Sequence, residues 1–521
     1  MKQNRLRRGW QGVFPDFRRV EVYLAAVHNA ANPNALYMVS FGGNDLTWLQ
    51  VQGGSLSPQS YLASLATALS TGIANLQTAG ARTIVVLNVY SYARVVGPGG
   101  VVTPANAIDV SEAATYSADV WSDLRAAGVN FIPADVEGVL KYVSRNPTRF
   151  GFTAATVLAS NPACGTASAL LCSPSQVVAP NAEQTYLWSD AHHLTTAGQT
   201  IEADLIYNLL TAPSQISLMA ESAVWGGLAR AAMIQGQIDQ GGQPRGPSGI
   251  NVWVGGGAGT QSVTNTPYFP NATGTSFGGT VGADYLTPSG IIVGAAISSG
   301  DQVRNFSTGG HFSQVDEALS LYAGYRTRAL WGNAVASYVL LQDHVARQVP
   351  LGIFTDQNSG DTSGRDLSLA LRGGWDFHVG RMTFGPVAGF VLQQVRLNGF
   401  SESGTTGFTA LSFDGQTRNS AVSQLGWRGS VDIGDWQPFA EMDWNHEWAD
   451  RTRSITASLT SIAAPSYTAA AVPVASDWAT VSLGASYRIN ARMSLRGAAL
   501  AMFANPRAGS YGGGVSMNVS F

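Results

Sequence analysis

The two halves of the chain carry different patterns of apolar and polar positions. In residues 20–212, short and nearly continuous apolar runs alternate with stretches of helical spacing. The apolar runs are 35–41, 83–89 and 130–133, and the helical stretches are 61–79 and 112–127. Continuous apolar runs are typical of buried parallel strands, and their alternation with helices indicates right-handed crossovers. We therefore expect an α/β domain on a parallel sheet, with a last helix from after His193 to about Leu210.

From Gly249 the apolar positions recur with a period of two. Leu367, Leu369 and Leu371, for example, alternate with Asp366 and Ser368. About twelve such segments follow one another with turn residues between them, and the last one ends the chain on Phe521. Aromatic residues gather near the segment ends: Tyr285, Tyr325, Trp331, Trp427, Trp436 and Trp444. Alternation with aromatics at the ends is the pattern of a transmembrane barrel with interfacial girdles.

A soluble β-sandwich would also alternate, but the composition favours the barrel. Charged residues make up only 12% of the chain, whereas about 25% is usual in soluble proteins, and there are 59 glycines. No run of 18 apolar residues offers a helical span. Charges recur on the polar face of successive segments, which suits a wet lumen. Because every backbone group must pair in lipid, the last strand should pair with the first and close the barrel.

Residues 213–248 connect the two halves. The stretch Ser217–Asp239 is compatible with a helix and rich in small residues, and Gly241–Pro247 would end it. The expected domains are therefore 1–212, the connector 213–248, and an antiparallel twelve-stranded barrel over 249–521.

Cysteine, histidine and charge usage narrow the chemistry. Cys164 and Cys172 have seven residues between them. We expect a short disulfide loop in an extracytoplasmic setting, with two unrelated thiols as the alternative. The seven histidines show no metal-ligand spacing with the cysteines, so neither a metal nor another cofactor is expected. The formal net charge is −3, and no basic cluster with interleaved aromatics indicates nucleic-acid binding.

The first residues do not form a complete export signal. Residues 1–8 are basic, as at the start of a signal peptide, but 9–19 supply neither an apolar segment nor a cleavage site. Since a protein of the outer membrane needs such a signal, we expect that this chain begins inside a longer protein.

Two short motifs in the α/β half carry chemistry. The first, Gly42-Gly43-Asn44-Asp45, directly follows a predicted strand, and the second, Asp190-Ala191-His192-His193, directly precedes a predicted helix. An Asp three residues before a His can fix the imidazole tautomer and support a general base at His193. An amide at the end of a parallel strand, such as Asn44, can donate to an oxyanion. The alternative is that the first motif is only a turn and the second only a helix cap.

These motifs resemble those of the GDSL esterase/lipase family, whose members are also called SGNH hydrolases. The resemblance implies a flavodoxin-like parallel sheet, with Asn44 in the oxyanion hole and Asp190 and His193 as catalytic residues. Leu194 stands where the family often has proline. His192 is a rival base, but it lies only two residues after Asp190. The whole arrangement resembles the GDSL autotransporter esterases, in which a connector helix plugs the barrel; an ordinary linker helix is the alternative.

The chain departs from that family ahead of Gly42. The family's nucleophile lies in a Gly-Asp-Ser motif near the mature N-terminus, and a second motif supplies an oxyanion-hole glycine. Here there is no serine before Ser40 and no matching glycine motif. Ser40 itself lies within the predicted strand and is a weak replacement. We therefore expect an incomplete hydrolase sheet, no nucleophile, and no activity of this chain alone.

Three functions follow from this pattern. The first is an outer-membrane autotransporter that displays a carboxylic-ester hydrolase at the cell exterior, with an acyl ester or lipid as substrate. The second is a non-enzymatic module for surface display or adhesion, which the absent serine favours and the retained Asn44, Asp190 and His193 disfavour. The third, a simple pore, is disfavoured by the connector helix. The expected partners are outer-membrane lipid and the barrel assembly machinery, and we expect a monomer whose passenger stays attached.

Overall fold

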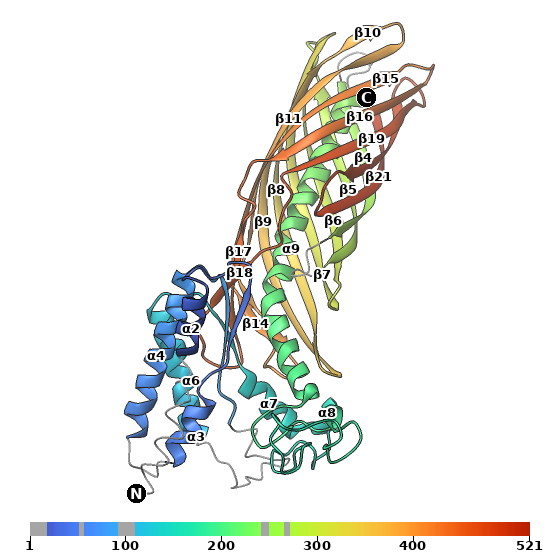
Figure 1. The fold of residues 1–521 in the computed structure, drawn as a ribbon. Coiled ribbons are helices and arrows are strands. Elements are labelled where there is room, and N and C mark those ends of the chain that lie inside the picture. Colours follow the sequence, from blue (N-terminus) through green and yellow to red (C-terminus); the bar gives the residue numbers. More distant parts are fainter. Residues whose placement is uncertain (1–17, 52–56, 92–109, 241–248, 265–270) are drawn as a thin grey trace, which may run out of the picture.

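The computed structural model describes residues 18–51, 57–91, 110–240, 249–264 and 271–521 (Figure 1). A small α/β unit lies at one end of a long barrel, and helix α9 connects the two. The helices of this unit are α2 (Arg18–Ala26), α3 (Gly43–Val51), α4 (Pro58–Thr78), α6 (Val110–Ala126), α7 (Val136–Arg145), η2 (Pro147–Phe150) and α8 (Ala182–Thr185). Its strands are β1 (Leu36–Val39), β2 (Thr83–Leu87) and β3 (Ile132–Ala134).

The three strands form a parallel sheet in the order β1-β2-β3. The central strand β2 is buried on both faces, which explains its continuous apolar run. Ile84 and Val86 pack with α4 and α6, whereas Val85 and Leu87 pack with α7 and α9. The predicted strands and helices are therefore confirmed, with ends that shift by up to three residues.

Strand β1 is the edge of the sheet. Leu36 and Met38 are exposed, while Val39 is buried and pairs with Val86. A three-stranded sheet with an apolar open edge, within the described residues, is compatible with an incomplete flavodoxin-like sheet.

Helix α9 (Thr196–Gln240) is one continuous helix of 45 residues, with Pro213 inside it. The expectation of two helices separated near residue 212 was wrong. Proline has no N–H, so it leaves the carbonyl four residues earlier without its helical donor. Here the Tyr467 hydroxyl donates to the Leu209 carbonyl at 2.9 Å and takes the place of that donor. A side chain from the barrel half thus lets the helix continue through a proline.

The second half forms a closed antiparallel barrel. In the described residues twelve strands surround the lumen, and β21 pairs with β4 from Ala508↔Val263 to Ser520↔Asn251. The predicted strand number and closure are confirmed. The strands are β4 (Gly249–Val263), β5 (Ala272–Leu286), β6 (Ile291–Phe306), β7 (Gly310–Arg326), β8 (Leu330–Leu351), β9 (Phe354–Trp375), β11 (Met382–Leu397), β15 (Gln416–Val431), β16 (Trp436–Glu447), β19 (Asp477–Arg488), β20 (Met493–Phe503) and β21 (Ala508–Ser520), with the short β10 (Phe377–Val379) and β13 (Ser403–Gly404) beside them.

Alternating side chains separate the outer wall from the lumen. Leu367, Leu369 and Leu371 are exposed, while Asp366 and Ser368 are buried inside. Five of the six girdle aromatics are exposed as expected: Tyr285, Tyr325, Trp427, Trp436 and Trp444.

The expectation for Trp331 was wrong. Leu330 faces outward, and because successive side chains of a strand point to opposite faces, Trp331 faces the lumen. There its indole N–H donates to Asp376 at 3.2 Å, and the Arg428 guanidinium lies 3.7 Å from the ring centroid.

The C-terminal part of α9 lies inside the barrel, as predicted for the connector (Figure 1). Polar side chains of the barrel wall reach it at several levels. Arg418 Nε lies 2.9 Å from Glu221 Oε1, and Gln314 donates to the Met219 carbonyl at 3.0 Å. Nearer the C-terminal end of the helix, Arg372 Nη1 lies 3.1 Å from Asp239 Oδ2.

A second sheet attaches the α/β unit to the barrel. Its strands are β12 (Phe400–Ser401), β14 (Leu411–Phe413), β17 (Ser454–Leu459) and β18 (Tyr467–Ala470), in that order. Asn130 of the α/β unit exchanges two hydrogen bonds of 3.0 and 2.9 Å with the backbone of Thr468. Beside this sheet, the buried Arg347 of β8 donates to the carboxylate of Glu402 and also to the side-chain oxygen of Asn208 in α9. No pattern in the sequence predicts this attachment.

Candidate active site

The segment that carries Asp190 and His193 is a tight turn just before α9. Trp188 and Leu194 form a β-bridge across the turn, and the Ser189 N–H donates to the His193 carbonyl at 2.7 Å. Trp188 is fully buried and its indole N–H donates to the Val157 carbonyl at 3.1 Å. The turn is therefore anchored to the core, and the side chains of Asp190 and His193 have little freedom to separate.

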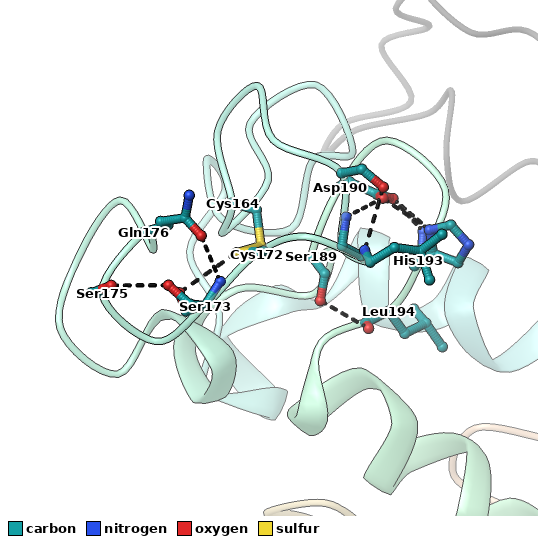
Figure 2. Close-up of a disulfide and its surroundings, with 12 residues drawn as sticks. Cys164, Cys172, Ser173, Ser175, Gln176, Ser189, Asp190, His193 and Leu194 are labelled. Atoms are coloured by element: carbon teal, nitrogen blue, oxygen red, sulfur yellow. Dashed lines mark hydrogen bonds and ion pairs between the residues drawn. A yellow bond between two sulfur atoms is a disulfide. The ribbon is translucent and has the colours of Figure 1, made fainter.

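Asp190 and His193 are in direct contact (Figure 2). His193 Nδ1 lies 2.9 Å from each of the two carboxylate oxygens of Asp190. Because Nδ1 faces the carboxylate, Nε2 is the ring nitrogen left for chemistry. The His193 side chain is 54% exposed and the Asp190 side chain only 11%, so the pair has a buried carboxylate and an accessible imidazole.

Backbone N–H groups fix the carboxylate of Asp190. The N–H groups of His192 and His193 donate to Oδ1 at 2.8 and 2.9 Å, and the N–H of Ala169 donates to Oδ2 at 2.8 Å. Burial by itself raises the pKa of Asp190, but these three donors and the His193 ring outweigh it and lower the pKa to about 2. Asp190 is therefore a carboxylate at neutral pH, held in one orientation.

The motif Gly42-Gly43-Asn44-Asp45 lies just beyond β1. Gly42 has φ +112°, and a Cβ there would lie 2.3 Å from the ring of Tyr116, so only glycine fits this position. Asn44 follows in the first turn of α3, and its side chain is exposed. Ser40 is also exposed and lies one residue past the end of β1.

The two motifs lie at the same edge of the sheet. The Tyr90 hydroxyl, just past β2, donates to the His192 carbonyl at 3.4 Å, and the Tyr90 ring lies 5.7 Å from that of Trp188. Since β1 and β2 are parallel neighbours, the residues after each strand meet at one carboxyl edge, where ligands of α/β sheets bind.

The structure brings only some of the predicted site residues into contact. Asp190 and His193 meet, and the ring that bonds Asp190 is that of His193, not that of its rival His192. Within the described part of the chain, no hydrogen bond joins the side chain of Asn44 or Ser40 to this pair.

Sequence reasoning missed the contribution of the disulfide loop to the site. Cys164 and Cys172 are joined, as expected, with their Cα atoms 6.0 Å apart. The loop between them supplies the Ala169 N–H that bonds Asp190 (Figure 2 shows the disulfide beside the turn). A backbone N–H leaves no mark in the sequence, so no pattern of residue types could have revealed this contact.

No group of three or more His, Cys, Asp or Glu side chains in the described residues is placed to hold a metal ion. No helix among those residues is long and apolar enough to cross a membrane.

Comparisons with known proteins concern both halves. Residues 252–499 match the family described as autotransporter beta-domain. The chain is 27% identical over 481 residues to Esterase EstA of Pseudomonas aeruginosa. The aligned region covers 90% of this chain and 72% of that protein. It is 23% identical over 335 residues to Lipase 1 of Photorhabdus luminescens, covering 64% of this chain and 49% of that protein.

Among solved structures, the translocator domain of the autotransporter NalP from Neisseria meningitidis is similar with a TM-score of 0.46 and 14% identity. The aligned region covers 58% of this chain and 98% of that one. The expected resemblance to an autotransporter with esterase and lipase relatives is confirmed by the sequence matches. The chain is a protein of the outer membrane.

Proposed function

We propose that this chain displays a carboxylic-ester hydrolase of the GDSL (SGNH) class on the exterior of the outer membrane. The observation that carries the proposal is the pair of Asp190 and His193, with Nδ1 of the imidazole 2.9 Å from a carboxylate that three backbone N–H groups hold in place. Esterase and lipase relatives support the same chemistry. In the proposed organisation, residues 1–212 are the partial passenger, 213–248 the lumen connector and 249–521 the barrel.

The proposed roles of Asp190 and His193 rest on the contact between their side chains, and that of Asn44 rests on its place after β1 and on the resemblance to the GDSL family. His193 Nε2 removes the proton of the attacking hydroxyl, and the hydroxyl oxygen forms a bond to the ester carbonyl carbon. Asp190 stabilises the imidazolium that results, and this imidazolium then protonates the departing alkoxide. Asn44 donates to the carbonyl oxygen while it carries negative charge, a contact worth about 2.7–4 kcal/mol in other hydrolases. Water attacks the acyl-enzyme by the same steps and releases the acid.

For the nucleophile of this scheme, the described residues offer no hydroxyl in contact with His193. No Gly-Asp-Ser motif precedes Gly42, and Ser40 makes no hydrogen bond to His193 among the described residues. We therefore propose that the 521-residue chain is inactive by itself. A surface-display or adhesion module is the second candidate, and the absent serine motif is the observation that favours it.

The test restores the nucleophile. A protein extended upstream with a segment that carries Gly-Asp-Ser should cleave p-nitrophenyl acetate, whereas the chain alone should not. In that extended protein His193→Ala should lower kcat by about 10³-fold or more, because the general base is lost. His192→Ala should keep the rate within a few-fold, since only the backbone of His192 bonds Asp190.

Two results would overturn the proposal. Full activity of the extended His193→Ala protein would show that another residue is the base. No activity in the extended protein, despite a correctly inserted barrel, would favour the display module. We also propose that the barrel is a monomer and that the outer-membrane barrel assembly machinery inserts it.

A further inference from the structure

The tip of the disulfide loop presents two consecutive leucines to solvent. Leu170 is 86% exposed and Leu171 79%, the highest values of any large apolar side chain in the described part of the chain. Both exceed the exposure of the outward side chains on the barrel wall, which lipid covers. Exposed leucines in water are unfavourable, and two in sequence at a loop tip mark a place where an apolar ligand can bind. We call Leu170 and Leu171 the leucine tip.

The leucine tip is held outward by an ordered loop. The disulfide joins the two ends of the loop, and the Cys164 N–H donates to the Ser189 carbonyl at 2.9 Å. Within the loop the Leu171 N–H donates to the Ser168 carbonyl at 2.9 Å. Because the backbone is already fixed, a ligand that covers the leucines does not bear the entropy cost of ordering the loop.

The leucine tip borders the candidate active site. Ala169, the residue before Leu170, donates its N–H to Asp190 Oδ2 at 2.8 Å. Consecutive Cα atoms are about 3.8 Å apart, so the Cα atoms of both leucines lie within roughly 12 Å of that carboxylate. An acyl chain whose ester group reaches His193 could therefore lie against the leucine tip.

The host membrane is too far away to be the ligand of the leucine tip. The α/β unit rests on the hairpin that joins β8 and β9, where the Gly352 N–H donates to Asp204 at 2.8 Å. Strand β8 has 22 residues. At about 3.3 Å per residue and a tilt of about 40°, it rises roughly 55 Å, of which the lipid band takes about 25 Å. The unit thus stands roughly 30 Å outside the hydrocarbon, and an apolar phase must reach it from the medium.

We propose that the leucine tip is an acyl-binding element that docks the site onto water-insoluble esters presented as droplets or micelles. This inference rests on the proposed esterase function and names its substrate class. Leu170 and Leu171 would enter the apolar phase while the adjacent Ala169 N–H keeps Asp190 in place. Contact with substrate and alignment of the catalytic carboxylate would thus depend on the same nine-residue disulfide loop.

The test measures binding without turnover. The full chain in nanodiscs, immobilised through the nanodisc scaffold, is exposed to an emulsion of a glyceryl trialkyl ether, which is a non-hydrolysable analogue of a triglyceride. Empty nanodiscs provide the background. The double variant Leu170→Ser with Leu171→Ser should bind the droplets at least about tenfold more weakly than the unaltered chain, because two apolar side chains no longer enter the ether phase. The matched control Val22→Ser removes a 59%-exposed apolar side chain on α2 and should bind normally.

A parallel assay separates this inference from the proposed function. In the upstream-extended protein, the double variant should cleave soluble p-nitrophenyl acetate at the normal rate and emulsified long-chain ester at least about tenfold more slowly. Unchanged droplet binding by the double variant would overturn the role of the leucine tip, whatever the esterase result. Equal weakening by Val22→Ser would overturn it as well. Loss of droplet binding in a protein that cleaves no ester would instead contradict the proposed function and leave the apolar docking role standing.

Discussion

Replacing Tyr467 with phenylalanine removes only the hydroxyl that hydrogen-bonds the Leu209 carbonyl in α9. That carbonyl would normally accept the N–H of residue 213, which is proline. Tyr467 is 1% exposed and Leu209 fully buried, so water cannot replace the lost hydroxyl. A buried carbonyl left unsatisfied costs about 1–3 kcal/mol. We expect Tyr467→Phe to destabilise α9 around Leu209 by about 1–2 kcal/mol.

The magnitude can be read from hydrogen exchange. At about 1.4 kcal/mol per factor of ten, amides of residues 209–217 should exchange roughly 5–30-fold faster in the variant. Tyr207→Phe is the matched control, because it removes an equivalent hydroxyl from a half-exposed tyrosine on the same helix. Its exchange should be unchanged.

A double-mutant cycle with Pro213→Ala tests whether the Tyr467 hydroxyl compensates for the N–H that proline lacks. Alanine at 213 restores the helical N–H donor to the Leu209 carbonyl, so the cost of Tyr467→Phe should fall to within about 0.5 kcal/mol of zero. If Tyr467→Phe costs the same in both backgrounds, the hydroxyl does not compensate for the proline and our account of the continuous helix is wrong.

Three further predictions concern the attachment and the candidate site. Glu402→Gln leaves the buried Arg347 cation, which donates to Asn208 of α9, without its carboxylate and should destabilise this junction of β8 and α9 by about 3–5 kcal/mol, seen as faster proteolysis near Asn208; unchanged proteolysis would contradict a structural role for the pair. Replacing Cys164 and Cys172 by serine should lower the unfolding free energy of the α/β unit by about 2–3 kcal/mol, measured by chemical denaturation, and an equal midpoint and slope would refute it. Because the pKa of Asp190 is lowered to about 2 from an unfolded value near 3.9, its stabilisation is present above about pH 4 and is lost as the pH falls through about 2. The stability difference between the unaltered chain and Asp190→Asn should therefore shrink on acidification from pH 5 to 2, and a constant difference would contradict the proposed network.

The barrel could be predicted closely because its determinants are local. A strand places successive side chains on opposite faces, so the run from Asp366 to Leu371 shows inside and outside without any knowledge of its neighbours. Closure then follows from the need to pair every backbone group in lipid. The inward position of Trp331 was not predicted, because an aromatic residue near a strand end suits either the girdle or the lumen. The neighbouring Leu330 occupies the outward position, so Trp331 faces the lumen.

The candidate site was predicted only in part. Asp190 and His193 are three residues apart on one turn, so their contact is a local matter that spacing can suggest. The partner of Asp190 from the disulfide loop is a backbone N–H 21 residues away, and every residue type except proline offers one. Asn44 lies in a different segment, and only the sheet brings its strand end to the same edge as the turn.

By itself, the sequence determined the two-part organisation, the strand alternation, the closed barrel, the disulfide partners and the Asp–His pair, because each depends on residues that are close along the chain or on a periodicity that local geometry imposes. The tertiary structure alone decided that α9 continues through Pro213, that Arg347 of β8 bonds Asn208 of α9, and that Ala169 holds Asp190. These three contacts join segments that are far apart in sequence. Their energies depend on burial and on donor–acceptor geometry, which exist only once the chain has folded.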